Sequence, residues 1–142
     1  MKRTVVIAAM EREVKPLVRG WQRTALSSGG QSWIVFEKEN QAIVISGIGK
    51  KSAERAAQVA VARYQPAVLI SAGLAGALIR SLKAGSLVTP NVVVDAADGR
   101  EYRCAATDVD IVGGGILVTA NEITGAEAKG KLVEQFHGLI VD

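Results

Sequence analysis

The sequence predicts an α/β fold with a mixed sheet, and three features indicate it. Two apolar, β-branched runs, at 4–9 and 67–72, are typical of strands covered on both faces. A segment with helical spacing, at 50–64, lies between them. A polar turn joins two further strand-like segments into a hairpin. Strands that alternate with helices favour an α/β sheet, and the hairpin makes it mixed.

The first elements follow from local composition. After the apolar run at 4–9, helix-favouring polar residues from Glu11 to Lys15 predict a short helix, with Pro16 within its first turns or just beyond. Strands are predicted at 33–37 and 41–46, because the tight polar turn Glu39-Asn40 separates them.

The segment at 50–64 gives the clearest helix. Its apolar residues recur every three or four positions, which places them on one face: Ala53, Ala56, Ala57, Ala60, Val61 and Tyr64. Because alanine dominates that face, the helix can pack close to a sheet. Pro66 ends it, and the strand at 67–72 is expected to be fully buried.

The second half continues the alternation. A β-branched stretch at 87–95 is interrupted by Pro90, and a strand is predicted at 116–119. A helix at 127–136 and an apolar run at 139–141 follow.

Composition limits the class of protein. The 142 residues suit one domain, and 49% apolar with 22% charged residues argue against disorder. The net charge of +3 is spread along the chain, so no nucleic-acid partner is expected. No leader or bilayer-spanning run is visible, so we expect no membrane partner and a cytoplasmic location. The single Cys104, expected to be a small buried side chain, excludes a disulfide framework and a cysteine-based zinc site.

Small residues follow the predicted strands at 46–50, 72–76 and 119–125, and Glu13 follows the first strand. Because parallel strands end at one edge of a sheet, these segments are expected to converge on one cleft. A carboxylate there can orient or deprotonate a water molecule. Glu13 can equally be an exposed carboxylate that stabilises a first helical turn, and both interpretations stay open.

Two nucleotide-binding motifs are excluded. A phosphate loop ending at Gly49-Lys50 requires glycine at position 44, which is Val44. A dinucleotide fingerprint from Gly47 requires glycine or alanine at position 52, which is Ser52. Neither nucleoside triphosphate nor NAD binding is therefore expected.

Four segments in order resemble one family: AAMEREV from Ala8, SGIGK from Ser46, AGLAG from Ala72 with LKAGSLV from Leu82, and ILVT from Ile116. The chain resembles the family 1 purine and uridine phosphorylases, most closely their hydrolytic branch, the methylthioadenosine/S-adenosylhomocysteine nucleosidases. The resemblance implies a three-layer α/β/α fold with a mixed central sheet. It also implies that residues 1–142 form a single nucleoside phosphorylase-like domain that is incomplete at its C-terminus.

The resemblance implies a reaction. Glu13 matches the acid that helps bind and activate the attacking water when a nucleosidase cleaves an N-glycosidic bond through an oxocarbenium-like transition state. It implies a small-molecule purine nucleoside such as methylthioadenosine, no metal or cofactor, and a homodimer in which a neighbour closes the pocket. Phosphate is a co-substrate only if the chain is a phosphorylase.

The resemblance also implies substrate-binding positions. These are Ile48 near the 5′ side, Leu74, Ala75 and Gly76 beside ribose and base, Ile123 in place of a stacking aromatic, and Thr124, where a backbone group reads the purine edge.

Several positions depart from the family pattern. Ser71 stands where phosphorolytic relatives place a phosphate-binding arginine, which favours water as the nucleophile. Leu74 replaces a family serine, and the stretch at 95–115 is shorter than in the typical nucleosidase. The family continues past Asp142 into a Met-Glu motif that binds ribose and an aspartate that protonates the purine.

Three functions therefore remain open. The first is nucleosidase-type hydrolysis with water activated by Glu13. The second is phosphorolysis of an unusual nucleoside in a pocket remodelled by Leu74. The third is a catalytically inactive chain that keeps nucleoside or partner binding.

Overall fold

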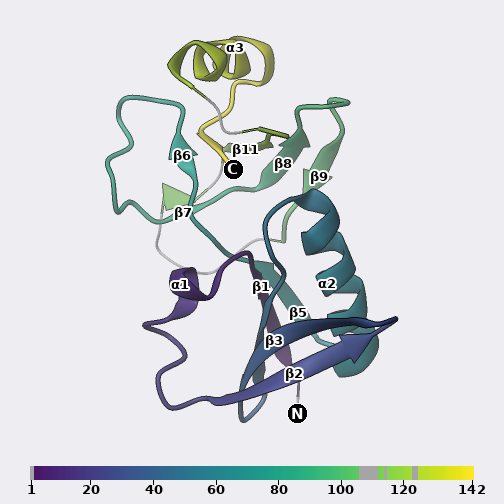
Figure 1. The fold of residues 1–142 in the computed structure, drawn as a ribbon. Helices are drawn as coiled ribbons and strands as arrows, with labels where there is room; N and C mark the ends of the chain where they lie inside the picture. The colour runs from purple at the N-terminus through teal and green to yellow at the C-terminus, as the bar shows by residue number, and fades with distance from the viewer. Residues whose placement is uncertain (1, 106–111, 114, 123–124) are drawn as a thin grey trace. The chain divides into compact units, whose positions relative to one another are not determined.

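The computed structural model describes residues 2–105, 112–113, 115–122 and 125–142. The chain forms two compact units, Met1–Gly73 and Leu74–Asp142, and most of their elements are labelled in Figure 1. The single domain that the sequence predicts for residues 1–142 stays a prediction.

The first unit is built on a five-stranded mixed sheet with strand order β2-β3-β4-β1-β5. Its elements are β1 (Thr4–Ala8), α1 (Glu11–Val14), β2 (Gln22–Ser28), β3 (Gln31–Lys38), β4 (Gln41–Ile45), α2 (Lys50–Tyr64) and β5 (Val68–Ser71). Strand β1 pairs in parallel with β4 and β5, whereas β2, β3 and β4 pair antiparallel. The predicted hairpin, the helix at 50–64 and the mixed α/β class are confirmed.

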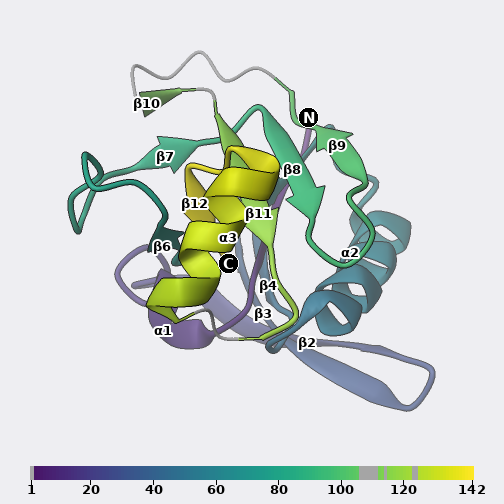
Figure 2. The same ribbon diagram turned by 90° about the horizontal axis from the view of Figure 1, so that it is seen from above.

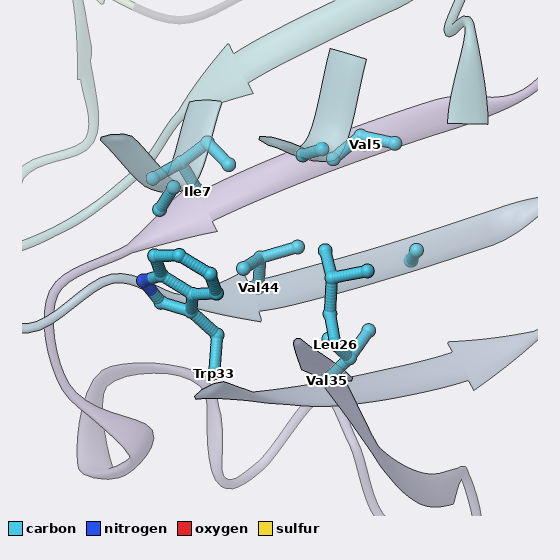
Figure 3. Close-up of a cluster of buried hydrophobic side chains, with 9 residues drawn as sticks. Val5, Ile7, Leu26, Trp33, Val35 and Val44 are labelled. Carbon is cyan, nitrogen blue, oxygen red and sulfur yellow. The ribbon is translucent and has the colours of Figure 1, made fainter. Parts of the chain in front are cut away.

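Successive side chains of β1 point alternately to the two faces of this sheet. Val5 and Ile7 join the core under α2, together with Ala56 and Ala60 of the helix. Figure 3 shows the sheet side chains of this cluster pointing into one space. Ala8 instead lies in the cluster on the other face, which also contains Val14 of α1. Helices therefore cover both faces of this sheet, as a three-layer arrangement requires.

One residue of the predicted helix face is placed differently. Val61 is 45% exposed, and Val59 packs against the core instead. The two residues are separated by about 200° around the helix, so the buried stripe is rotated away from Val61 and toward Val59.

Strand β5 corrects the expectation of a fully buried strand at 67–72. It is the last strand in the sheet order, and Val68, Leu69 and Ile70 are 50%, 43% and 42% exposed. An apolar run indicates a strand, but its burial depends on which neighbours the fold supplies.

Strand β2 was not predicted. Its sequence is mostly polar, and Leu26 is its one buried residue, because the strand lies at the other edge of the sheet. The Gly29-Gly30 dipeptide was the available signal, since both glycines have positive φ, 58° and 78°, in the turn that joins β2 to β3.

The second unit contains a five-stranded mixed sheet with strand order β6-β12-β11-β8-β9 and a two-stranded parallel pair, β10 with β7. Its elements are β6 (Gly76–Ala77), β7 (Val88–Thr89), β8 (Val92–Asp95), β9 (Glu101–Arg103), β10 (Val112–Gly113), β11 (Ile116–Thr119), α3 (Ala126–Phe136) and β12 (Ile140–Val141). Strands β8, β11 and β12 run parallel, and α3 packs on β11 (Figure 2). The predicted strand at 116–119, the break at Pro90 and the second helix are confirmed. The short strands β6, β9 and β10 were not predicted.

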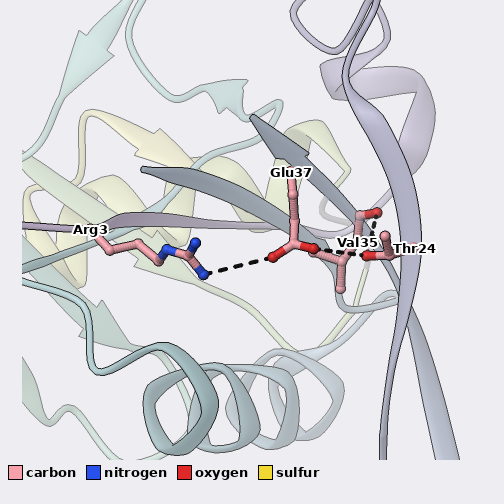
Figure 4. A network of polar contacts seen from close by, with 4 residues as sticks. All are labelled: Arg3, Thr24, Val35 and Glu37. Atoms are coloured by element: carbon pink, nitrogen blue, oxygen red, sulfur yellow. Dashed lines mark hydrogen bonds and ion pairs between the residues drawn. The ribbon is translucent and has the colours of Figure 1, made fainter. Parts of the chain in front are cut away.

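A polar network ties β2 and β3 to the segment before β1 (Figure 4). Thr24 Oγ1 donates to Glu37 Oε2 at 3.2 Å and to the Val35 carbonyl at 3.5 Å. Arg3 Nη1 lies 3.7 Å from Glu37 Oε1, and the Arg3 guanidinium lies 4.8 Å from the centre of the Tyr64 ring. The end of α2 is therefore linked to the sheet by charge as well as by packing.

Two further observations concern the composition-based expectations. Cys104 is exposed, which corrects the expectation of a buried side chain. Within the described part of the chain, no helix is long and apolar enough to cross a bilayer.

Candidate active site

Glu13 is positioned by the end of β1 and the first turn of α1. Met10 has an extended backbone with φ −132° and ψ 142° before the helix begins. Its N–H donates to Glu13 Oε2 at 2.9 Å, so the side chain reaches back to the start of its own helix. The half-buried carboxylate is thus held at the carboxyl end of a buried parallel strand, where the sequence predicted it.

The loop after β4 lies beside the same strand end. The Ser46 and Gly47 N–H groups donate to the carbonyls of Ala8 and Ala9 at 2.9 and 3.1 Å. Ser46 is buried, and its hydroxyl donates to the Ala8 carbonyl at 3.3 Å. These bonds fix the start of the loop and leave the Ile48 side chain 76% exposed.

Glycine is needed in this loop for its backbone conformation. Gly47 and Gly49 have φ values of 84° and 100°, which residues with a Cβ rarely adopt. Gly49 is also the N-cap of α2, so the loop leads directly into the helix that covers the core.

The segment after β5 completes this edge of the sheet. The Ala72 N–H donates to the Ile7 carbonyl at 3.0 Å, so the chain continues beside β1 after the strand has ended. Gly73 then lies against Glu13, since a Cβ built on it would be 3.3 Å from Glu13 Oε1. Three of the predicted segments, those after β1, β4 and β5, therefore meet at one sheet edge.

The fourth segment lies elsewhere in the topology. The strand at 116–119 is β11, which pairs with β8 and β12 in the sheet of the second unit. The single sheet expected from the sequence is not observed, because β11 and β1 belong to separate sheets. That this segment joins the other three at one cleft stays a prediction.

The turn at 74–76 begins the second unit. Leu74 is 74% exposed, and Ala75 borders a hollow of about 260 Å³ that is also lined by Val88 and Ile140. Gly76 pairs with Val141 in the β6–β12 ladder. The roles expected for Leu74, Ala75 and Gly76 in substrate binding stay predictions, as does that of Ile48. Ile123 and Thr124 lie outside the described residues.

A second set of polar residues, not predicted from the sequence, lies at the ends of the parallel strands of the second unit. Asp95 is in register with Thr119, and Asp142 follows β12. Burial raises the pKa of Asp142 above its usual value, and a hydrogen bond with Thr119 partly opposes the rise. These residues could have been identified from their positions in the sequence, because each one stands at or just after the end of a predicted strand.

The described residues contain no group of three or more His, Cys, Asp or Glu side chains arranged to hold a metal ion.

Gly73 was not predicted as part of the site. Its contact with Glu13 joins segments that are far apart in sequence, and composition alone does not show which strand ends become neighbours.

Comparison with known proteins gives consistent matches. A model of the Phosphorylase superfamily matches residues 3–137. The 5′-methylthioadenosine/S-adenosylhomocysteine nucleosidase of Buchnera aphidicola subsp. Schizaphis graminum is 30% identical over 88 residues, which are 60% of this chain and 37% of that protein. The match thus spans less than two fifths of the relative's length.

Solved structures show the same fold. A Helicobacter pylori variant of this nucleosidase with 5′-methylthioadenosine in its active site matches with a TM-score of 0.83 at 18% identity, over 100% of this chain and 75% of that one. A mutant of Helicobacter pylori futalosine hydrolase matches with a TM-score of 0.81 at 19% identity, over 100% of this chain and 79% of that one. These similarities confirm the predicted nucleoside phosphorylase-like α/β fold.

Proposed function

Because the chain belongs to the Phosphorylase superfamily, we propose that it acts in hydrolytic cleavage of the N-glycosidic bond of a purine nucleoside such as methylthioadenosine. The observation that carries the proposal is the placement of Glu13. Its carboxylate is held by the Met10 N–H at 2.9 Å, at the edge where β1, β4 and β5 end. The similarity to nucleosidases supports the same substrate class.

In this proposal Glu13 orients a water molecule and accepts its proton as the water attacks the anomeric carbon. The N-glycosidic bond breaks, and its electron pair leaves with the purine, which takes up a proton. A positioned general base contributes typically about 10²–10⁴-fold to such a step. The hydrogen bond from Met10 holds the carboxylate in one orientation, so less ordering is required when substrate binds. The transition state carries positive charge on the ribose, which a nearby carboxylate also stabilises.

Water is favoured over phosphate as the nucleophile. Ser71, at the position of the phosphate-binding arginine of phosphorolytic relatives, ends β5 opposite Ile7 and supplies a hydroxyl rather than a cation. Since phosphate recognition relies on charge-assisted bonds, this replacement weakens the case for phosphorolysis.

The remaining substrate contacts are proposed by resemblance. Ile48, exposed after β4, is assigned to the 5′ side of the nucleoside, and Leu74, Ala75 and Gly76 to ribose and base. Ile123 and Thr124 are assigned to the purine. The homodimer, the cytoplasmic location and a reaction without cofactor are further parts of this proposal.

The test is turnover of methylthioadenosine and inosine by the 142-residue chain, with and without phosphate, followed by chromatographic detection of free base. We expect adenine release that does not require phosphate. Release that depends strictly on phosphate would establish phosphorolysis instead. Nucleoside binding without turnover would contradict catalysis and support the inactive, binding-only chain.

A further inference from the structure

Gly73 borders the Glu13 carboxylate directly. A Cβ placed on Gly73 would lie 3.3 Å from Glu13 Oε1, 3.7 Å from Cδ and 3.9 Å from Oε2. The nearest atoms are therefore those of the carboxylate itself. A separation of 3.3 Å is shorter than ordinary van der Waals contact, so an added methyl group would displace the carboxylate by a few tenths of an ångström.

Glycine is not required at this position by the backbone. Gly73 is not among the glycines with positive φ, unlike Gly47 and Gly49 in the loop after β4. An alanine can therefore adopt the Gly73 conformation, and the feature that matters is the missing side chain.

The opposite side of the carboxylate is also fixed by main chain. Glu13 Oε2 accepts the Met10 N–H at 2.9 Å, whereas Oε1 is the oxygen nearest to Gly73. The Ala72 N–H bond to the Ile7 carbonyl holds the Gly73 segment beside β1. The carboxylate thus lies between two backbone segments, one that donates to it and one that leaves room for it.

We propose that Gly73 is a positioning residue for the reaction: the absence of a side chain there sets the position and orientation of the Glu13 carboxylate toward water. The proposal rests on the proposed function of Glu13. It assigns to the segment after β5 a role separate from the substrate contacts expected of the turn at 74–76.

The test is a double-mutant cycle of Gly73→Ala and Glu13→Gln. Gly73→Ala should lower kcat about tenfold with a smaller change in KM, because a misplacement of 1 Å can cost about 10²-fold and a shift of a few tenths of an ångström costs part of that. In the Glu13→Gln background the same change should alter kcat less than about twofold, since the group being positioned is gone. Gly130→Ala, in open space within α3, is the matched control and should leave kcat unchanged.

A readout independent of turnover is the amide resonance of Met10. Its N–H is bonded to Glu13 Oε2, so Gly73→Ala should shift this resonance, whereas Gly130→Ala should not. If the wild type shows no turnover, the proposed function fails, and the Met10 resonance still tests the placement of the carboxylate. An unshifted Met10 resonance, or rate effects that multiply in the double variant, would overturn the proposal.

Glu13→Asp provides a rescue if Gly73→Ala lowers the yield of folded protein. The shorter side chain withdraws the carboxylate from Gly73, so the double variant should recover the thermal midpoint lost in Gly73→Ala. A double variant that remains as unstable as Gly73→Ala would show that Glu13 is not the group displaced.

Discussion

Single glycines in this chain have different physical roles. Gly47 and Gly49 adopt a backbone conformation with positive φ, whereas Gly73 allows the Glu13 carboxylate to approach the main chain closely. Gly138, between α3 and β12, is a second case of close approach. A Cβ there would lie 2.6 Å from Val118 Cγ2 and 2.7 Å from Leu78 Cδ1. Val118 is fully buried and β-branched, so it has little freedom to move away.

Gly138→Ala should therefore destabilise the second unit by about 1–3 kcal/mol, the usual cost of overpacking a core. The measurement is the free energy of unfolding from urea titration. Gly130→Ala is the control, because its Cβ meets nothing within 4 Å and alanine favours the helix by up to about 1 kcal/mol. Equal effects from the two substitutions would contradict this account.

Individual residues differ in how far their surroundings can be predicted from the sequence. The place of Glu13 in the fold was predictable, because a carboxylate directly after an apolar strand and at the start of a helix has a defined position, while its catalytic role stays a prediction. The contact between Gly73 and Glu13 was not, because it depends on β5 pairing with β1 in a specific register. The raised pKa of Asp142 was not predicted for the same reason, since the surroundings of this carboxylate depend on the pairing of β12 with β11 in the second sheet.

At the scale of elements, α2 is attached to its sheet along its middle and at its C-terminal end. Its middle packs through Ala56 and Ala60, and its last residue, Tyr64, lies beside the Arg3–Glu37 pair. Burial, the negative charge of Glu37 and a hydrogen bond to that carboxylate raise the pKa of Tyr64 above 10.0, while Arg63 and Arg3 lower it.

Glu37→Gln should lower the pKa of Tyr64 toward its ordinary value, because the neighbouring negative charge is removed. Absorbance titration in a Tyr102→Phe background isolates Tyr64, since the chain has 2 tyrosines. Glu39→Gln, in the exposed turn of the same hairpin, should leave the titration unchanged. A curve unaffected by Glu37→Gln would contradict the proposed linkage.

The same shift has a consequence for stability. The folded protein binds the Tyr64 proton more tightly than the unfolded chain does. The contribution of this proton to the free energy of unfolding is therefore fully present below the pKa of Tyr64 in the unfolded chain. It is lost as the pH rises through the pKa of Tyr64 in the folded protein. In Glu37→Gln this alkaline loss should be smaller.

The positions of helices and strands could be predicted from hydrophobic periodicity and from helix-breaking residues. The burial of those elements could not be predicted in this way. The helix at 50–64 has the predicted bounds because its alanine stripe and Pro66 act locally. Strand β5 is exposed and β2 was not predicted, because both lie at sheet edges. The hydrophobic pattern of an edge strand does not indicate how far the strand is buried or whether it pairs. Edge position is set by the order of strands, which a single sequence does not encode locally.

For the whole molecule, motif order predicted the family better than any single motif did. The superfamily match over residues 3–137 agrees with four short segments that are individually unspecific. The single sheet expected from the sequence is not observed, because β11, the strand at 116–119, lies in a different sheet from β1. The substrate-binding assignments still depend on resemblance, because Ile48 and Leu74 are exposed side chains whose role requires a ligand.

The central claim is that the Glu13 carboxylate activates water. The most direct measurement compares phosphate-independent adenine release from methylthioadenosine by Glu13→Gln and Glu11→Gln. Glu11 is the matched control, since it lies in the same helix and its exposed carboxylate is 3.6 Å from Arg23. Glutamine can still accept the Met10 N–H, so the fold is retained.

We predict that Glu13→Gln loses about 10²–10⁴-fold in kcat, while Glu11→Gln stays within about twofold of the wild type. Equal rates for the two variants, or full activity in Glu13→Gln, would contradict the account.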